Sequence, residues 1–264
     1  MNMLMTGAAG GIGRPLAKLF AGKGYRMALV DLDEGGLKTT AEAVRGLGAE
    51  CSTYVADVSD RDKVIELKDR VAAEFSDVDL LINNIGTAAE GDFEDVPFEE
   101  VHKMMAVNYY ATVHMLQAFL PSMIARGKGQ VVNMASVAGL TAMPTAACYS
   151  ASKHAVVGMT EALRAELKDK GIKVTLLCPS YVRTPIYQST RVYGYHRGYV
   201  ESQLKACIEP DVAAEVIFRG IEKGKYLVIV GMIGKAGFAV KRMSMPLARY
   251  IQYRMDKSYG KYKV

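Results

Sequence analysis

The sequence predicts an α/β protein with a doubly wound parallel sheet of about seven strands. Three observations lead to this prediction. Short apolar runs alternate with segments of helical periodicity, several of these runs are almost continuously apolar, and 264 residues are enough for one large core. Strands that alternate with helices require right-handed crossovers, so we expect helices on both faces of the sheet.

Seven strands are expected, at residues 1–6, 26–31, 49–57, 79–84, 129–136, 172–179 and 226–231. Helical periodicity follows most of them, as in "RPLAKLFAGKG" and "DKVIELKDRVAAEF". Ser59 and Asp62 predict a capping-box start for the helix after the third strand, and Pro210 predicts the start of another helix. No linker or internal repeat interrupts the chain, so residues 1–231 are expected to form one domain and residues 232–264 an extension.

Charge is unevenly distributed along the chain. The formal net charge is +5, but residues 231–264 hold eight Lys or Arg and one Asp, a local +7, which leaves about −2 for residues 1–230. This distribution gives no sign of a nucleic-acid surface on the body. The four cysteines lack CxxC or metal-type spacing, which indicates free thiols and no metal site. With no signal-like start and no apolar run of about 20 residues, a cytoplasmic location is expected.

A glycine-rich turn, "TGAAGGIG" from Thr6 to Gly13, lies directly between the first strand and the first helix. Glycines at such a turn allow a tight bend and let the backbone approach a diphosphate at the positive end of the helix. Asp31 ends the second strand, where a carboxylate accepts hydrogen bonds from ribose hydroxyls and repels a 2′-phosphate. The pattern therefore favours NAD over NADP. The alternatives are a merely flexible turn, and an Asp31 or Asp33 that only caps the next helix.

The ordered set of motifs resembles the short-chain dehydrogenase/reductase family, in its short single-domain branch. The matching segments are TGxxxGxG at 6–13, an acidic residue at 31, "ADV" at 56–58, "NNIG" at 83–86, Asn108, Ser136, YxxxK at 149–153 and "PSYVRTP" at 179–185. The resemblance covers the chain to about residue 231 and implies a Rossmann-type fold with NAD as cofactor. The sequence departs from the family pattern at Ile85, where the family has NNAG, and at Ser180, where it has PG.

Tyr149 and Lys153 lie one helical turn apart, which indicates acid/base chemistry. Hydride transfer between an alcohol carbon and a nicotinamide requires a group that takes or gives the hydroxyl proton. A free tyrosine has a pKa of about 10, and a nearby ammonium favours its phenolate, so we expect Lys153 to lower the pKa of Tyr149. The resemblance implies that Lys153 also holds the nicotinamide ribose, that Ser136 hydrogen-bonds the substrate oxygen and that Asn108 helps to hold a water in a proton relay.

The resemblance also implies the contacts of the cofactor. Asp57 and Val58 are expected at the adenine edge, Asn83 and Gly86 along the adenosine half, and Thr184 at the nicotinamide carboxamide. The complete expected set of cofactor-binding residues is Gly7, Gly11, Ile12, Gly13, Asp31, Asp57, Val58, Asn84, Gly86, Tyr149, Lys153, Pro179, Val182 and Thr184.

Two segments are expected on the substrate side. Residues 184–209 correspond to the family's mobile lid and hold tyrosines at 187, 193, 195 and 199 and basic residues at 191 and 197. These rings indicate a lipophilic or aromatic substrate, or simply pack the lid onto the protein. The basic amphipathic extension either lies on a membrane surface, covers the substrate entrance, or packs on the body or a neighbouring subunit. Pro246 is expected to bend it or to separate two helices.

The sequence thus predicts an NAD-dependent oxidoreductase that interconverts a secondary alcohol and a ketone, with a small-molecule substrate. A non-catalytic NAD-binding redox sensor and an isomerase or epimerase that uses NAD transiently are the alternatives. The complete Ser, Tyr, Lys and Asn set favours the dehydrogenase. The resemblance implies a homodimer or homotetramer that pairs through residues 98–126 and 148–170, and the tail allows peripheral membrane contact.

Overall fold

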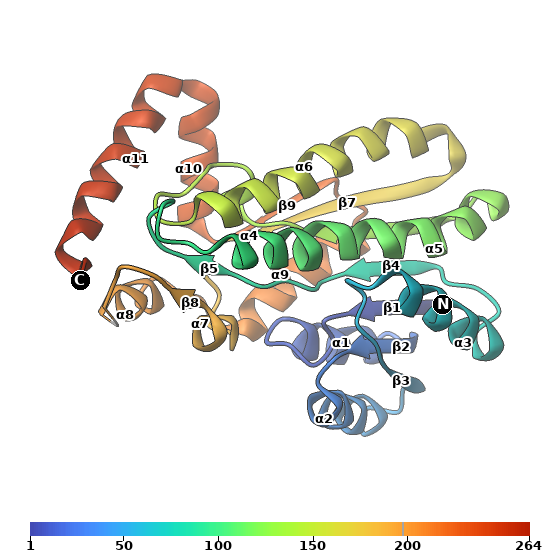
Figure 1. Ribbon diagram of the computed structural model, residues 1–264. Coiled ribbons are helices and arrows are strands. Elements are labelled where there is room, and N and C mark those ends of the chain that lie inside the picture. The colour runs from blue at the N-terminus through green and yellow to red at the C-terminus, as the bar shows by residue number, and fades with distance from the viewer. Residues whose placement is uncertain (197) are drawn as a thin grey trace.

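The computed structural model describes residues 1–196 and 198–264 and contains a seven-stranded parallel sheet (Figure 1). Its strands are β1 (Asn2–Thr6), β2 (Arg26–Asp31), β3 (Cys51–Val55), β4 (Leu80–Asn83), β6 (Gly129–Met134), β7 (Ile172–Pro179) and β9 (Leu227–Val230). They follow the order β3-β2-β1-β4-β6-β7-β9, and every neighbouring pair is parallel. The predicted sheet is therefore confirmed. The chain builds outward from β1 on one side and from β4 on the other, which leaves a crevice beyond their carboxyl ends.

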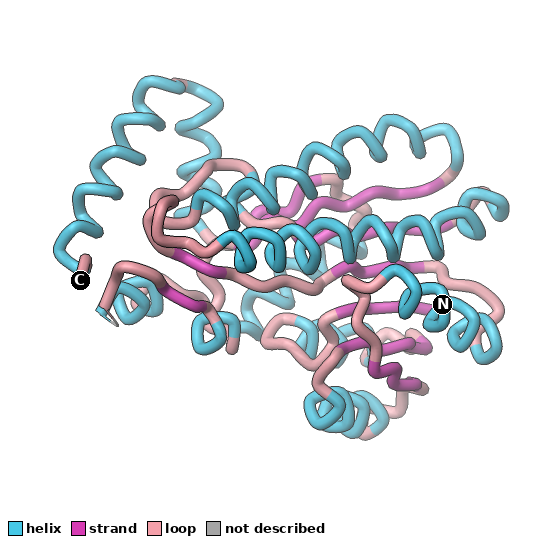
Figure 2. The backbone as a smooth tube through the Cα atoms, in the orientation of Figure 1, coloured by secondary structure: helices cyan, strands magenta, loops and turns pink. Residues whose placement is uncertain are grey.

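Helices cover both faces of this sheet (Figure 2). On one face pack α1 (Gly13–Ala21), α2 (Glu34–Arg45) and α9 (Pro210–Glu222). On the other pack α3 (Arg61–Glu74), α5 (Ala111–Arg126) and α6 (Ala147–Leu167). The short α4 (Phe98–Met105) leads into α5 through a π-helical turn, Ala106–Tyr110. Both faces of the strands are thus buried, which explains their nearly continuous apolar sequences.

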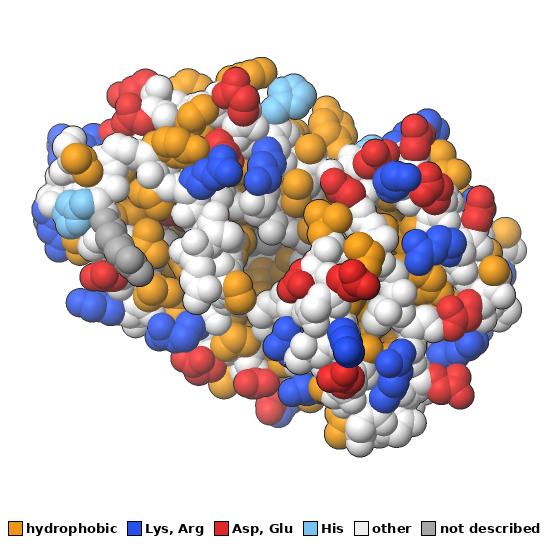
Figure 3. Space-filling model, turned by 60° about the horizontal axis from the view of Figure 1, so that its bottom comes forward, with side chains coloured by type: hydrophobic (Ala, Val, Ile, Leu, Met, Phe, Trp, Pro, Cys, Tyr) orange, Lys and Arg blue, Asp and Glu red, His pale blue; other side chains and the backbone are white. Residues whose placement is uncertain are grey.

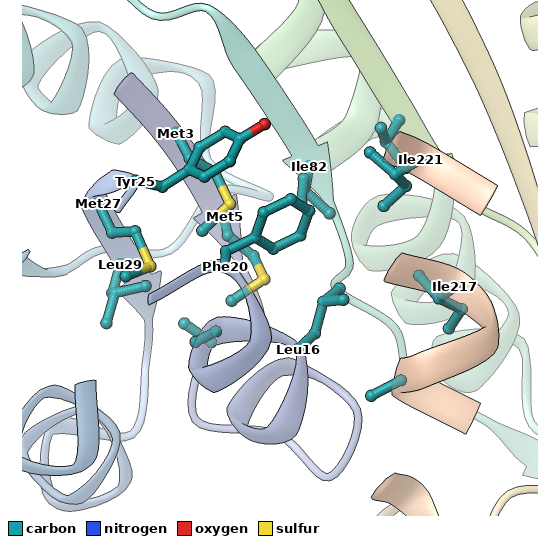
Figure 4. Packing of buried hydrophobic residues seen from close by; sticks show 14 of the residues in the cluster. Met3, Met5, Leu16, Phe20, Tyr25, Met27, Leu29, Ile82, Ile217 and Ile221 are labelled. Atoms are coloured by element: carbon teal, nitrogen blue, oxygen red, sulfur yellow. The ribbon is translucent and has the colours of Figure 1, made fainter. Parts of the chain in front are cut away.

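The core beneath α1 is centred on Phe20, whose side chain is completely buried (Figure 4). Its ring meets the edges of Tyr25 and Phe218 at centroid distances of 4.9 and 5.0 Å. Ile217 and Ile221 of α9 belong to the same cluster. Because Leu16 and Phe20 lie one turn apart, α1 presents a single apolar face to the sheet and to α9.

Two helix starts show how aspartates order the chain. Asp33 caps α2 and accepts a 2.9 Å hydrogen bond from the Gly36 amide. Asp60 caps α3 and accepts from the amide of Asp62 at 2.8 Å. The expected cap at Ser59 was wrong by one residue, because the Ser59 hydroxyl donates instead to Asp57 at 2.6 Å. The start of α9 at Pro210 is confirmed.

A second, two-stranded sheet was not predicted. It pairs β5 (Ala89–Glu90) in parallel with β8 (Arg191–Val192). Strand β8 belongs to the expected lid segment, which also contains α7 (Ile186–Ser189) and α8 (Gly198–Leu204). Arg197, one of the basic residues noted in that segment, lies outside the described residues. Two-residue strands carry no periodicity, so the sequence held no signal for this pairing.

The extension forms two helices, α10 (Met232–Met243) and α11 (Met245–Tyr259), separated at Ser244. Pro246 occupies the first turn of α11, where its missing amide costs nothing, so separation into two helices is confirmed. Lys241 and Gln252 donate hydrogen bonds of 2.7 and 2.6 Å to the carbonyls of Leu140 and Ala142. The helices turn the chain back toward α8 (Figure 1). A domain boundary at residue 231 stays a prediction.

Among the described residues we found no helix with the length and apolar character needed to cross a membrane.

Replacing Phe20 by Ala should lower the free energy of unfolding by about 3–5 kcal/mol, because the change leaves a cavity between α1, α9 and the sheet. Urea unfolding followed by circular dichroism measures the loss. Val212→Ala is the control, since Val212 of α9 is 57% exposed and its truncation should change stability by less than about 0.5 kcal/mol. Equal effects of the two changes would contradict the described packing.

Candidate functional site

A cavity of about 620 Å³ lies beyond the carboxyl ends of the strands. The glycine turn and the residues after β4, β6 and β7 form one part of its wall, and α6, α7 and α8 contribute side chains to the rest. Tyr259, at the end of α11, also lines it. Figure 3 shows the surface hollowed near the middle of the face that it presents.

The glycine turn is shaped so that side chains have no room. Gly7 adopts a left-handed φ of +64°, and a Cβ there would lie 2.7 Å from the Asn84 carbonyl oxygen. A Cβ on Gly11 would lie 2.6 Å from Cβ of Thr184, and one on Gly13 would overlap the Gly7 oxygen. The Asn84 amide donates to the Gly7 carbonyl at 3.0 Å and so ties the turn to the end of β4.

This turn fits the diphosphate of a dinucleotide. Among the described residues no side chain caps α1, and the amides of Gly11, Ile12 and Gly13 have no hydrogen-bond acceptor there, whereas the Arg14 amide donates to the Gly10 carbonyl at 3.1 Å. Gly11 and Ile12, at this helix start, line the cavity. Bare backbone donors and the positive end of a helix dipole are the chemistry that binds phosphate.

Asp31 reaches the cavity from the end of β2. Its carboxylate accepts backbone hydrogen bonds from Ala9 at 2.9 Å, Leu32 at 2.8 Å and Asp33 at 3.1 Å. The cap of α2 is Asp33, so the reading of Asp31 as that cap is wrong. A carboxylate oriented in this way can also accept hydrogen bonds from ribose hydroxyls.

Tyr149 and Lys153 lie in the first two turns of α6, and both line the cavity together with Ser136. The Lys153 ammonium is 5.9 Å from the centre of the Tyr149 ring and donates a 3.2 Å hydrogen bond to the Met134 carbonyl. A Cβ on Gly86 would lie only 3.2 Å from Nζ of Lys153. The glycine after β4 thus makes room for the lysine.

Burial dominates the electrostatics of this pair. It raises the pKa of Tyr149 to about 12, with a further rise from the charge of Glu90 and an opposing effect of the Ser136 hydroxyl. Burial lowers the pKa of Lys153 to about 8. The protein alone therefore does not produce the expected lowering of the Tyr149 pKa, because burial outweighs the opposing effect of the Ser136 hydroxyl.

Asn108 lies in the π-helical turn and is completely buried. Its side chain accepts from the Thr87 amide at 2.8 Å and donates to the Thr87 carbonyl at 3.0 Å and to the Ser152 hydroxyl at 2.9 Å. These bonds join the loop after β4 to α6. The Asn108 side chain therefore holds the loop and α6 together as a brace. Its backbone carbonyl accepts only a long 3.4 Å hydrogen bond from the Thr112 hydroxyl, so this carbonyl is the Asn108 group that could bind a relay water.

The structure brings most of the predicted residues together. Those that line the cavity are Gly7, Gly11, Ile12, Asp31, Asn84, Gly86, Ser136, Tyr149, Lys153, Pro179, Val182 and Thr184. Those that do not are Gly13, Asp57, Val58, Asn83 and Asn108.

Some of these exceptions have evident structural partners. Asp57 accepts from the Ser59 amide at 2.9 Å, Val58 is 1% exposed, and Asn83 donates to Asn133 at 2.9 Å inside the sheet. Cofactor contacts of Asp57 and Val58 stay predictions.

Sequence reasoning missed several side chains of the cavity. Glu90, Tyr181, Gln203 and Tyr259 line it. Tyr181 lies inside the 179–185 motif and Gln203 inside the expected lid segment, so both could have been predicted, whereas Glu90 and Tyr259 lie in segments without a motif. The partner of Asn108, Ser152, was within reach, because it lies inside the Tyr149–Lys153 motif. The tyrosines at 187 and 199 line the cavity, as the lid interpretation requires.

Comparison with known proteins fixes the family. Residues 1–192 match the family model described as short chain dehydrogenase. The chain belongs to the short-chain dehydrogenase/reductase (SDR) family. It is thus an SDR oxidoreductase, and its cavity has the NAD(P) site typical of such enzymes.

Two relatives cover most of the chain. The SadH protein of Mycobacterium tuberculosis, whose name carries the word oxidoreductase, is 35% identical over 239 residues, which are 88% of this chain and 87% of SadH. The 17-beta-hydroxysteroid dehydrogenase 13 of Rattus norvegicus is 34% identical over 232 residues, which are 87% of this chain and 74% of that protein.

Solved structures share the fold. An SDR from Burkholderia phymatum in complex with NAD superposes with a TM-score of 0.85 at 29% identity, covering 93% of this chain and 94% of that one. A short-chain dehydrogenase from Sphingobium yanoikuyae in complex with NADPH gives 0.80 at 26% identity, covering 94% and 93%.

Lys153 should leave a signature in the pH dependence of stability. Its folded pKa of about 8 lies below the unfolded value, so between about pH 8 and 10 the unfolded chain binds more protons and stability rises with pH. The difference in unfolding free energy between the wild type and Lys153→Met should change by on the order of 2 kcal/mol over this interval. Parallel pH profiles of the two proteins in urea would contradict the lowered pKa.

Proposed function

We propose that the protein is an NAD-dependent oxidoreductase that interconverts a secondary alcohol and a ketone. The observation that carries this proposal is the shared cavity, in which Ser136, Tyr149 and Lys153 lie together with the glycine turn and Asp31. Membership of the SDR family supports the reaction class.

In the proposed reaction the bound nicotinamide supplies or accepts the hydride. Ser136 donates a hydrogen bond to the substrate oxygen, and Tyr149 gives or takes the proton at that oxygen. With a pKa of about 12, Tyr149 suits proton donation to a ketone at neutral pH. Alcohol oxidation needs a lower pKa, and positive charge on Lys153 and on an oxidised nicotinamide acts in that direction. Asn108 holds the loop after β4 in place for both directions.

The preference for NAD is proposed from Asp31. Its carboxylate, which three backbone amides hold in place, would accept hydrogen bonds from ribose hydroxyls and repel a 2′-phosphate. Similar solved structures contain either cofactor, since the Burkholderia protein was solved with NAD and the Sphingobium protein with NADPH.

The substrate is proposed to be lipophilic or aromatic. Tyr181, Tyr187, Tyr199 and Tyr259 surround the side of the cavity formed by α7, α8 and the end of α11. Such rings offer large apolar surfaces with polar tips. The name of the Rattus norvegicus relative gives a hydroxysteroid as its substrate, a secondary alcohol of this general kind.

Association with other molecules is also proposed. Phe98 and Tyr110, which are 71% and 48% exposed, lie on the segment from α4 to α5 through which a homodimer or homotetramer would pair. In the extension, Met243, Leu247 and Tyr250 are exposed beside several cations, as peripheral membrane contact would require. Analytical ultracentrifugation measures the first association and liposome co-sedimentation the second.

Purified protein incubated with NAD should oxidise at least one member of a panel of steroid, cyclic and aromatic secondary alcohols, followed by NADH absorbance. Tyr149→Phe should lower kcat by at least about 100-fold, because general acid/base catalysis contributes about that much, while NADH still binds. Tyr253→Phe, which removes the hydroxyl of a side chain that is 56% exposed on α11, serves as the control. A fully active Tyr149→Phe protein would refute the proposed proton transfer.

Asp31→Ala should raise the ratio of kcat/KM for NADP to that for NAD by about 10-fold or more, because the repulsion of the 2′-phosphate and the ribose hydrogen bonds are lost together. The exposed Asp69→Ala on α3 is the matched control and should leave the ratio unchanged. A wild type that prefers NADP would show that Asp31 does not select the cofactor.

A further inference from the structure

Glu90 is a carboxyl group in the cavity that the proposed reaction does not use. Glu90 is the last residue of β5. Its backbone carbonyl accepts a 2.8 Å hydrogen bond from the Tyr193 amide of the lid. Its side chain accepts two hydrogen bonds of 2.7 Å, from the Tyr199 hydroxyl and from the Gln203 amide. Both donors reach the same oxygen, Oε2. Among the described residues no hydrogen bond is made to Oε1.

The two donors are rigidly held. Tyr199 and Gln203 lie one turn apart on α8 and are 1% and 7% exposed. The Tyr199 ring packs edge-on against Tyr259 at 5.2 Å, and its hydroxyl also shares a hydrogen bond with Thr145. All three members of the cluster, Glu90, Tyr199 and Gln203, line the cavity that contains Tyr149. They form a built polar site rather than a mobile surface group.

The carboxyl group has little compensation for its loss of water. Within the described part of the chain no Lys, Arg or His forms an ion pair with Glu90, and burial raises its pKa. A half-buried carboxylate that accepts two hydrogen bonds on one oxygen keeps acceptor capacity on the other, which a donor group of a bound molecule can use. The rings of five tyrosines that line the cavity also favour a cationic donor.

We propose that Glu90, positioned by Tyr199 and Gln203, binds a second hydrogen-bond donor of the substrate, a hydroxyl or ammonium group remote from the reacting alcohol. Glu90 and Tyr149 line the same cavity. One substrate molecule can therefore meet both groups in the same cavity. The proposal deepens the proposed function and rests on it for the position of the reacting carbon.

The test uses three probes with the same ring: cyclohexanol, 1,4-cyclohexanediol and 4-aminocyclohexanol. Both kcat/KM with NAD and the dissociation constant by calorimetry are measured for each. The wild type should favour one of the two bifunctional probes over cyclohexanol by about 10- to 100-fold, the range expected for a hydrogen bond to a charged group. Glu90→Leu should bring this ratio close to one.

Glu90→Gln distinguishes the two donors. It keeps an acceptor oxygen and removes the charge, so a preference for the ammonium probe should be lost while a preference for the diol should largely persist. Glu94→Gln is the matched control, because Glu94 is exposed in the same connection and should leave all ratios unchanged. Circular dichroism and thermal unfolding of each variant verify that it is folded.

The outcomes separate this proposal from the proposed function. A binding preference that depends on Glu90 without turnover of any alcohol would support the donor site and refute the dehydrogenase. Turnover with the same substrate ratios in the wild type and in Glu90→Leu would support the dehydrogenase and overturn the donor site. Absence of any preference in the wild type for a bifunctional probe, by either measurement, would also overturn it.

Discussion

The reversal of strand order between the parallel strands β1 and β4 is the constraint on which the rest of the molecule depends. Parallel strands end at one edge of the sheet, and the reversal opens a crevice there that no crossover helix fills. The glycine turn after β1, Asp31 after β2 and the segment after β4 reach the crevice from one half, and the end of β7 reaches it from the other. The Asn84 side chain, bonded to the Gly7 carbonyl, joins strands β1 and β4 at that point.

Burial has opposite effects on the two titrating groups of the site. Burial raises the pKa of Tyr149 and lowers the pKa of Lys153, so in each case it favours the neutral form of the group. The site is therefore poised to respond to charge brought by a cofactor. The brace formed by Asn108 lies next to this pair, and the π-helical turn that carries it interrupts an otherwise continuous helical segment. Such turns commonly occur at functional sites.

The sheet and the reacting side chains were predictable because their signals are local. Apolar runs mark strands, and the Tyr149–Lys153 spacing marks one helix face. Two features were not predictable from sequence: the pairing of β5 with β8, and the positions of Glu90 and Tyr259 in the cavity wall. Both depend on contacts between distant segments and carry no periodic pattern. The sign of the Tyr149 pKa shift was misjudged for a related reason. Sequence spacing reveals a charged neighbour, but it does not reveal burial, which is the largest cause of the shift in the Tyr149 pKa.

The lid and the extension are fastened to each other rather than only to the body. Tyr199 packs on Tyr259, His196 packs on Tyr262, and the Val264 amide donates a 3.1 Å hydrogen bond to the Gly194 carbonyl. Substitutions that reshape one of these segments thus change the surface on which the other rests. A change of substrate range is therefore expected to need coordinated substitutions in two contacting segments that lie about 60 residues apart in sequence.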